Sequence, residues 1–119
     1  MKNQKIIVLQ VDLADDPTKI KDYIDYHSNV WPEVIQDLKD RPIGRMRIYN
    51  VSNRLVMLLE VDQNFKLEDG IHIEPPSIKV EEWSETMFPL LRKLESGEFD
   101  TWKEMNKVCL LYTSQSPRD

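Results

Sequence analysis

The segment 54–61, Arg-Leu-Val-Met-Leu-Leu-Glu-Val, constrains the fold most, because it is apolar at both alternating sets of positions. Successive side chains of a strand point to opposite faces of its sheet. The apolar positions are Val56 and Leu58 on one face, and Leu55, Met57 and Leu59 on the other. A sheet with helices on one face only would normally have a polar second face. We therefore expect both faces of this strand to be covered.

Local patterns in the first half of the chain predict a strand followed by a broken helix. Residues 5–12 are rich in β-branched residues, which favours a strand. Asp16 followed by Pro17 is typical of a helix start, because the carboxylate caps free amides and proline has no amide to satisfy. Pro32 cannot lie inside that helix. The helix is therefore expected to break around Ser28-Asn29 and to restart as a second piece, which carries Val34, Ile35 and Leu38.

The second half predicts a hairpin, a helix and a last strand. The expected elements are strands at 45–51 and 54–61 joined by a turn at Ser52-Asn53, an irregular segment at 62–77, a helix over 78–94 and a strand from 104 to about 111. The order strand, helix, strand, strand, helix, strand is that of an α+β, ferredoxin-like fold, in which helices cover one face of an antiparallel sheet. The economical cover for the second apolar face is the sheet of a second copy, which predicts a homodimer. A long loop such as 62–77 folded across that face is the alternative.

Composition excludes several classes of function. The net charge is −5, and Lys and Arg do not cluster, which argues against nucleic acid and against anionic membranes as partners. The apolar run after the N-terminus is strand-sized, so neither a signal peptide nor a membrane span is expected. One cysteine, Cys109, allows no intrachain disulfide and indicates the cytoplasm. His27 and His72 lack partners at metal-ligand spacing, so no metal site is predicted.

Tyr23 and His27 form the candidate reactive pair. They are four residues apart, so they are neighbours on a helix surface. They share a face with Ile20 and Ile24, and we expect this face to turn towards the sheet. An inward histidine beside a phenol can act as a general acid and base. The alternative is a partly buried histidine with a structural role at the helix end.

Three further features allow two interpretations each. Trp83 and Trp31 are either core residues or stacking platforms for the C–H face of a sugar. Trp102 can be either as well. Glu60 interrupts an apolar strand, and it needs a partner such as Arg45 or Arg47, or a place at a polar pocket.

The chain resembles the L-rhamnose mutarotase family from about Lys5 to Val108. The most specific feature is His27-Ser28-Asn29-Val30-Trp31-Pro32-Glu33 after a helical Tyr23; the pieces that follow in order are Arg47-Ile48-Tyr49, Asn53-Arg54-Leu55 and Glu82-Trp83. The resemblance implies a dimeric α+β barrel with an antiparallel sheet. It also implies a cofactor-free and metal-free carbohydrate isomerase, which interconverts the α and β anomers of L-rhamnose or a related 6-deoxy sugar by acid–base ring opening and closure.

The resemblance assigns His27 as the catalytic residue, with Tyr23 and Trp83 as substrate-binding residues. Two positions depart from the family pattern. Met46 replaces a binding tyrosine, and Ser84 replaces the second of two tryptophans. Two other functions remain open on the same barrel, a different cofactor-free enzyme such as an oxygenase, and a non-catalytic small-molecule binding module.

The end of the sequence looks foreign to the domain. The stretch Cys109-Leu110-Leu111-Tyr112-Thr113-Ser114 is what the end sequence of a common transposon-based sequencing adapter encodes, and Pro117-Arg118-Asp119 matches its continuation. We therefore expect a mutarotase-like domain over 1–108 and a non-native tail over 109–119. A genuine disordered tail is the alternative.

Overall fold

The α+β order predicted from the sequence is present in the computed structural model, which describes residues 4–111. In chain order the elements are β1 (Gln4–Asp12), α1 (Pro17–His27), α2 (Pro32–Asp40), β2 (Ile43–Val51), β3 (Arg54–Asp62), a 3-10 turn (Leu67–Asp69), α3 (Ile78–Met87), a second 3-10 turn (Phe88–Leu90) and β4 (Lys103–Glu104). The strands form one sheet in the order β2-β3-β1-β4, and all neighbours are antiparallel. This is the ferredoxin-like arrangement.

The predicted helix break is confirmed, and its cause is local. The Asp16 carboxylate accepts a hydrogen bond from the Thr18 amide at 2.9 Å, which caps the start of α1. The helix ends at His27, and Pro32 opens α2. Trp31 lies between the two helices in an extended conformation, with φ −61° and ψ 139°. It therefore belongs to the connection and not to the face of α1.

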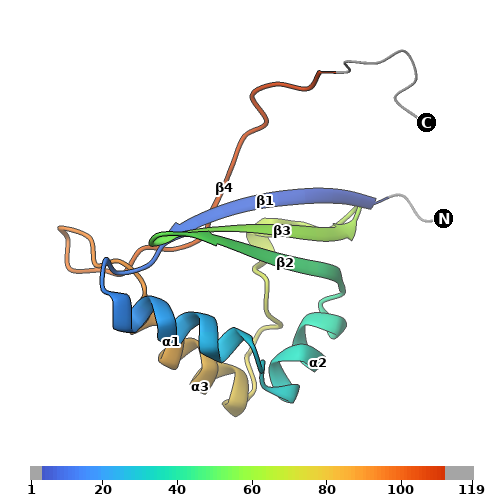
Figure 1. The fold of residues 1–119 in the computed structure, drawn as a ribbon. Coiled ribbons are helices and arrows are strands. Elements are labelled where there is room, and N and C mark those ends of the chain that lie inside the picture. The colour runs from blue at the N-terminus through green and yellow to red at the C-terminus, as the bar shows by residue number, and fades with distance from the viewer. Residues whose placement is uncertain (1–3, 112–119) are drawn as a thin grey trace.

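The helix predicted over 78–94 is too long, and the strand predicted over 104–111 is wrong for all but its start. α3 ends at Met87 because Pro89 lies in the following 3-10 turn and cannot donate a helical hydrogen bond. β4 comprises Lys103–Glu104 alone, paired with Leu9 and Gln10 of β1. After one more hydrogen bond, from the Met105 amide to the Val8 carbonyl, the chain leaves the sheet (Figure 1).

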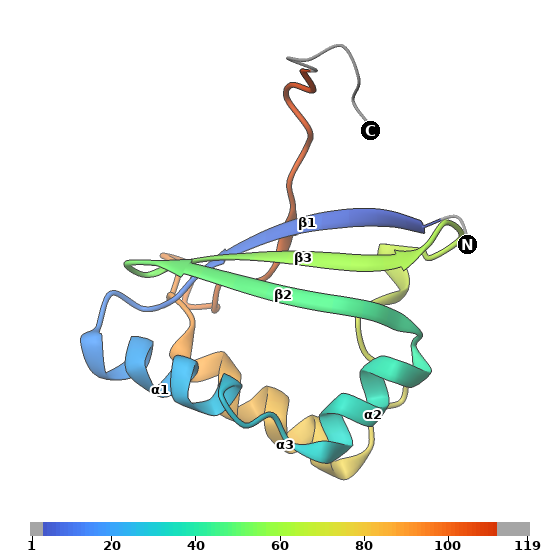
Figure 2. The same cartoon turned by 45° about the vertical axis from the view of Figure 1, so that its right-hand side comes forward.

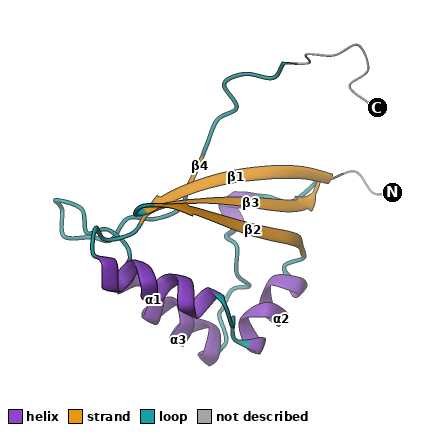
Figure 3. Cartoon of the chain, in the orientation of Figure 1, coloured by secondary structure: helices purple, strands orange, loops and turns teal. Residues whose placement is uncertain are grey.

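All three α-helices lie on one face of the sheet (Figures 2 and 3). The side chains on that face form the core, and the strand residues buried there are Ile7, Leu9, Val11, Ile43, Leu55, Met57, Leu59 and Val61. The irregular segment 62–77 also packs on this side, because Phe65, Leu67 and Ile71 contact the same apolar cluster as Leu59. The alternative in which this segment covers the second face is therefore wrong.

No helix within residues 4–111 lies on the second face of the sheet. Ile6 and Tyr49 on that face remain 56% and 54% exposed. Glu60 also lies there, and its carboxylate pairs with the Arg47 guanidinium at 2.9 Å and with Arg45 at 3.9 Å. The inter-strand pairing proposed for Glu60 is confirmed, so this carboxylate is not part of a pocket on the helix side.

The helices of residues 4–111 are short. The longest, α1, has 11 residues. Within this part of the chain no helix combines the length and the apolar character that crossing a bilayer requires.

Candidate active site

A cavity of about 550 Å³ lies between the helices and the sheet, within the size range of small-molecule sites. Its walls come from α1, α2, α3 and the first three strands, and also from residues 67–72 and 101–102. Most of the wall is aliphatic or methionine side chains. The hydrogen-bonding side chains on it are few, and they include Tyr23, His27, His72 and Ser84. A polar ligand in this cavity would rely on these groups for orientation.

His27 reaches the cavity from the last turn of α1 with one ring nitrogen already engaged. Its Nδ1–H donates to the Tyr23 backbone carbonyl at 2.9 Å, because a carbonyl can only accept. This contact fixes the neutral tautomer that carries its lone pair on Nε2. Within the described residues no protein donor or acceptor contacts that Nε2, so it is available to a ligand.

Burial sets the protonation of this pair. It lowers the pKa of the His27 imidazole, an effect that the hydrogen bond to the Tyr23 carbonyl opposes only in part. Burial also raises the pKa of the Tyr23 phenol above its ordinary value. Near neutral pH the site therefore holds an uncharged imidazole that can accept a proton and a phenol that keeps its proton.

Aromatic rings hold His27 on two sides. The imidazole stacks on the Tyr23 ring, with centroids 4.1 Å apart and an interplanar angle of 23°. Trp83 of α3 meets it edge-on, with centroids 5.3 Å apart. Trp31 packs edge-on against Trp83 at 5.2 Å. Trp83 is both a core residue and part of the cavity wall, which confirms the core interpretation, while its role as a stacking platform for a sugar stays a prediction.

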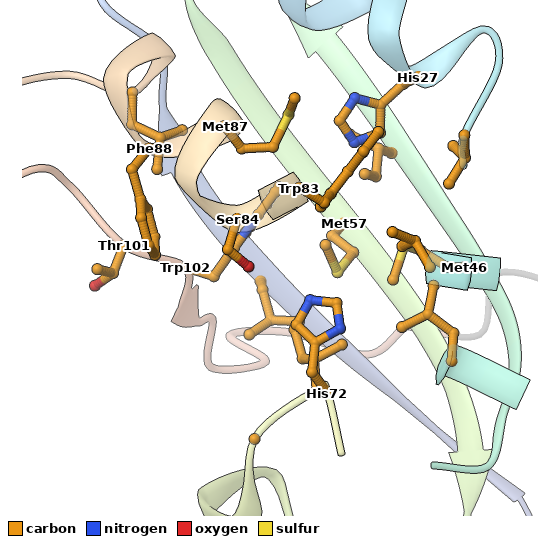
Figure 4. Close-up of a pocket in the computed structure, with 18 of the residues that line it drawn as sticks. His27, Met46, Met57, His72, Trp83, Ser84, Met87, Phe88, Thr101 and Trp102 are labelled. Atoms are coloured by element: carbon orange, nitrogen blue, oxygen red, sulfur yellow. The ribbon is translucent and has the colours of Figure 1, made fainter. Parts of the chain in front are cut away.

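The structure thus brings the three predicted site residues, Tyr23, His27 and Trp83, together on the lining of the cavity. Figure 4 shows His27 and Trp83 there. One detail of the prediction is wrong. Ile24 is 44% exposed, so it does not share the inward face of Tyr23 and His27. Tyr23 is the one buried residue of α1, so the inward face of this helix is narrower than predicted.

Met46 and Ser84, the two positions that depart from the family pattern, line the same cavity. Trp102 does so as well, and it is half-buried. The departures therefore affect the shape of the site directly.

Sequence reasoning missed the second cavity imidazole. His72 lines the cavity, and its Nδ1 lies 2.6 Å from Oδ2 of Asp37. Asp37 and His72 are 35 residues apart, on α2 and on the segment before α3. The spacing rules that find metal ligands and helical pairs use short separations, so no local signal joins these residues. Within residues 4–111 no cluster of three His, Cys, Asp or Glu side chains is arranged to hold a metal ion.

Comparison with known proteins agrees with this geometry. The chain is 28% identical over 104 residues to an L-fucose mutarotase of Xanthomonas campestris pv. campestris, a match that covers 85% of this chain and 83% of the relative. It is 30% identical over 104 residues to a UPF0734 protein of Dictyostelium discoideum, covering 82% of each.

A solved structure shares the fold. The crystal structure of an L-rhamnose mutarotase from Formosa agariphila superposes with a TM-score of 0.64 at 17% identity, covering 91% of this chain and 99% of that one. The sequence profile of the L-rhamnose mutarotase family matches residues 6–111. This chain therefore belongs to the L-rhamnose mutarotase family, whose members are carbohydrate isomerases.

Proposed function

We propose that this protein is an aldose mutarotase that interconverts the α and β anomers of L-rhamnose or a related 6-deoxy sugar. The observation that carries the proposal is the free Nε2 of a neutral His27 on the wall of a cavity large enough for a monosaccharide. Family membership and the L-fucose mutarotase relative support the same reaction.

The proposed mechanism uses His27 as a general base and then as a general acid. Nε2 takes the proton of the anomeric hydroxyl, and the electron pair left on that oxygen forms the carbonyl. The bond between the anomeric carbon and the ring oxygen breaks, and the ring oxygen takes up a proton from the protonated His27 imidazole. The aldehyde turns about its bond to the next carbon, and the reverse steps close the ring on its other face. The sugar gains and loses equal numbers of protons.

The walls suit a 6-deoxy sugar. Trp83 offers an aromatic surface to the C–H face of a pyranose, and the Tyr23 phenol offers a proton to a hydroxyl. Met46, Ile48 and Met57 make the sheet side of the cavity apolar. An apolar wall accepts the methyl group of a 6-deoxy sugar, whereas the extra hydroxyl of an ordinary hexose would need a hydrogen-bond partner there.

We also propose that the protein is a homodimer through the second face of the sheet. Val56 and Leu58 lie on this face beside Ile6 and Tyr49, and none of the helices that the structure describes covers them. Met105 and Val108 add exposed apolar side chains as the chain leaves the sheet, and Val108 is 97% exposed. Two copies packed face to face would bury both features and form the dimeric barrel.

Saturation-transfer NMR on equilibrium mixtures of L-rhamnose and of L-fucose anomers tests the activity. We expect catalytic amounts of protein to transfer saturation between the two anomeric signals faster than buffer alone. A protein that binds the sugar but leaves the exchange rate unchanged would instead be a non-catalytic binding module.

Light scattering tests the assembly separately. A homodimer should have about twice the 14.1 kDa chain mass at micromolar concentration. A soluble monomer at that concentration would contradict the proposed dimer without affecting the proposed reaction.

A further inference from the structure

His72 is a second imidazole on the cavity wall, and the mechanism above makes no use of it. It comes from the segment before α3, whereas His27 comes from α1, and Figure 4 shows the two rings at different edges of the cavity. Its side chain is 31% exposed. A ligand that fills the cavity from Trp83 towards residues 70–72 would meet this ring.

A buried carboxylate holds the His72 ring in place. The Asp37 side chain is 8% exposed, and one of its oxygens lies 2.6 Å from Nδ1 of His72. A carboxylate only accepts hydrogen bonds, so Nδ1 carries the proton and Nε2 carries the lone pair of the neutral ring. No protein group within residues 4–111 contacts that Nε2. This is the arrangement by which a carboxylate orients an imidazole in hydrolytic triads.

The segment that carries His72 is fastened at several points to α2 and its end. The other Asp37 oxygen accepts a hydrogen bond from the Ile73 amide at 3.2 Å. Arg41 donates from Nε to the Gly70 carbonyl at 3.0 Å, and its guanidinium lies over the Phe65 ring at 4.4 Å from the centroid. These contacts hold the segment on both sides of His72, so the position of the ring is defined before a ligand arrives.

We propose that His72, positioned by Asp37, is a specificity-determining residue that contacts the sugar. Its Nε2 accepts a hydrogen bond from a ring hydroxyl remote from the anomeric carbon. The inference rests on the proposed function, and it follows from the scarcity of polar groups on the cavity wall. A buried hydroxyl that lacks a partner is costly, so a correctly placed acceptor selects the sugar whose hydroxyl reaches it. His27 then acts on the anomeric centre while His72 fixes which way the ring lies.

Two variants separate this role from a structural one. His72→Ala should raise KM for the preferred sugar by about 5- to 20-fold, the scale of one hydrogen bond, and should change kcat much less.

Asp37→Asn keeps the oxygen that holds the Ile73 amide, but its amide N–H donates to Nδ1 and moves the ring proton to Nε2. KM should rise as in His72→Ala, while the melting temperature stays close to that of the parent. Asp40→Asn, an exposed carboxylate near the end of the same helix, is the matched control.

The ring itself can be observed, because the chain has only two histidines. In protein labelled with ¹⁵N-histidine, L-rhamnose or L-fucose should shift the Nε2 signal of His72, and Asp37→Asn should switch its tautomer. This binding readout needs no catalysis, so it is informative even if the anomers do not exchange. Singly deoxygenated sugars then identify the hydroxyl, since one of them should bind the parent more weakly but bind His72→Ala and the parent equally.

The proposal fails if a saturating sugar leaves the His72 Nε2 signal unmoved, or if His72→Ala discriminates every deoxygenated sugar as the parent does. It fails in a different way if His72→Ala lowers kcat with KM unchanged and removes a limb of the pH profile. That result would make His72 a proton-transfer group.

Discussion

The two faces of the sheet are built from the same strands, but the helices cover one face and leave the other exposed. Leu59 and Leu58 are adjacent on β3, yet Leu59 is fully buried under the helices, whereas Leu58 lies on the face that none of the described helices covers. The core and the cavity that His27 lines lie between the helices and the helix-side face. The second face carries exposed apolar groups and the ion pairs of Glu60. One chain is thus sufficient to complete the first face, whereas the second is suited to contact with another molecule.

The largest expected effect concerns the helix-side face. His27→Ala should slow anomer exchange by roughly 10²–10⁴-fold, the usual scale for a general acid–base residue. Sugar binding should persist because the other wall residues remain. NMR exchange rates measure this effect, and Tyr49→Phe on the second face is the control expected to leave the rate unchanged. Parent-like exchange in a folded His27→Ala protein would return this histidine to a structural role.

Adjacent residues of β3 test the contrast in stability. Leu59→Ala should lower the free energy of unfolding by about 2–5 kcal/mol, because it opens a cavity in a closed core. Leu58→Lys should instead shift the protein from dimer to monomer and leave the helix-side core intact. Denaturant unfolding at one fixed protein concentration, together with light scattering, separates the two effects. Equal losses of core stability would show that the two faces do not differ as described.

Trp83 should affect binding more than chemistry. Trp83→Ala removes apolar contact from the ground state and the transition state alike, so KM should rise by about 10-fold or more while kcat falls less. Since Trp83 is also in the core, Trp83→Phe serves as the conservative variant and should retain most of the binding. A change in kcat alone would place Trp83 closer to the reacting atoms than we propose.

The rate should depend on pH in one direction. Because burial lowers the pKa of His27 below its ordinary value of 6.5, the imidazole is neutral at pH 7 and gains a proton only in more acidic solution. Exchange should fall about tenfold per pH unit below that pKa, since a single proton is involved. The same depressed pKa stabilises the fold above pH 6.5, and this contribution is lost as the pH falls. A ¹⁵N-histidine titration with a midpoint above 6.5 for His27 would contradict both expectations.

The smallest effect is expected at the end of the chain. Residues 112–119 lie outside the described residues, and their composition has no periodic apolar pattern. Truncation after Leu111 should therefore leave the melting temperature within a few degrees of the parent, roughly the change that 1 kcal/mol produces in a domain of this size. A larger loss would show that these residues pack, and would weaken the interpretation of 109–119 as a non-native tail.

The sequence was sufficient to predict those features of the fold that depend on neighbouring residues alone. The helix start at Asp16-Pro17, the break before Pro32 and the order of the elements follow from caps, proline sterics and alternation. The Tyr23–His27 contact follows from helical spacing alone. The extent of the last strand could not be predicted in the same way, because an extended segment becomes a strand only where a neighbour supplies hydrogen bonds. Within residues 103–111, β1 pairs with Lys103–Glu104 and accepts one more hydrogen bond from Met105.

Only the tertiary structure determined that Asp37 and His72 meet at the end of the cavity away from His27, and that Ile24 is exposed. Asp37 contacts His72 because α2 and the segment before α3 pack together on the helix side of the sheet. The two residues are 35 positions apart, so no short-range sequence pattern predicts the contact. Alternation showed that β3 is apolar on both faces. Which face receives the helices depends on how three separate helices pack at once, and that is a property of the whole chain.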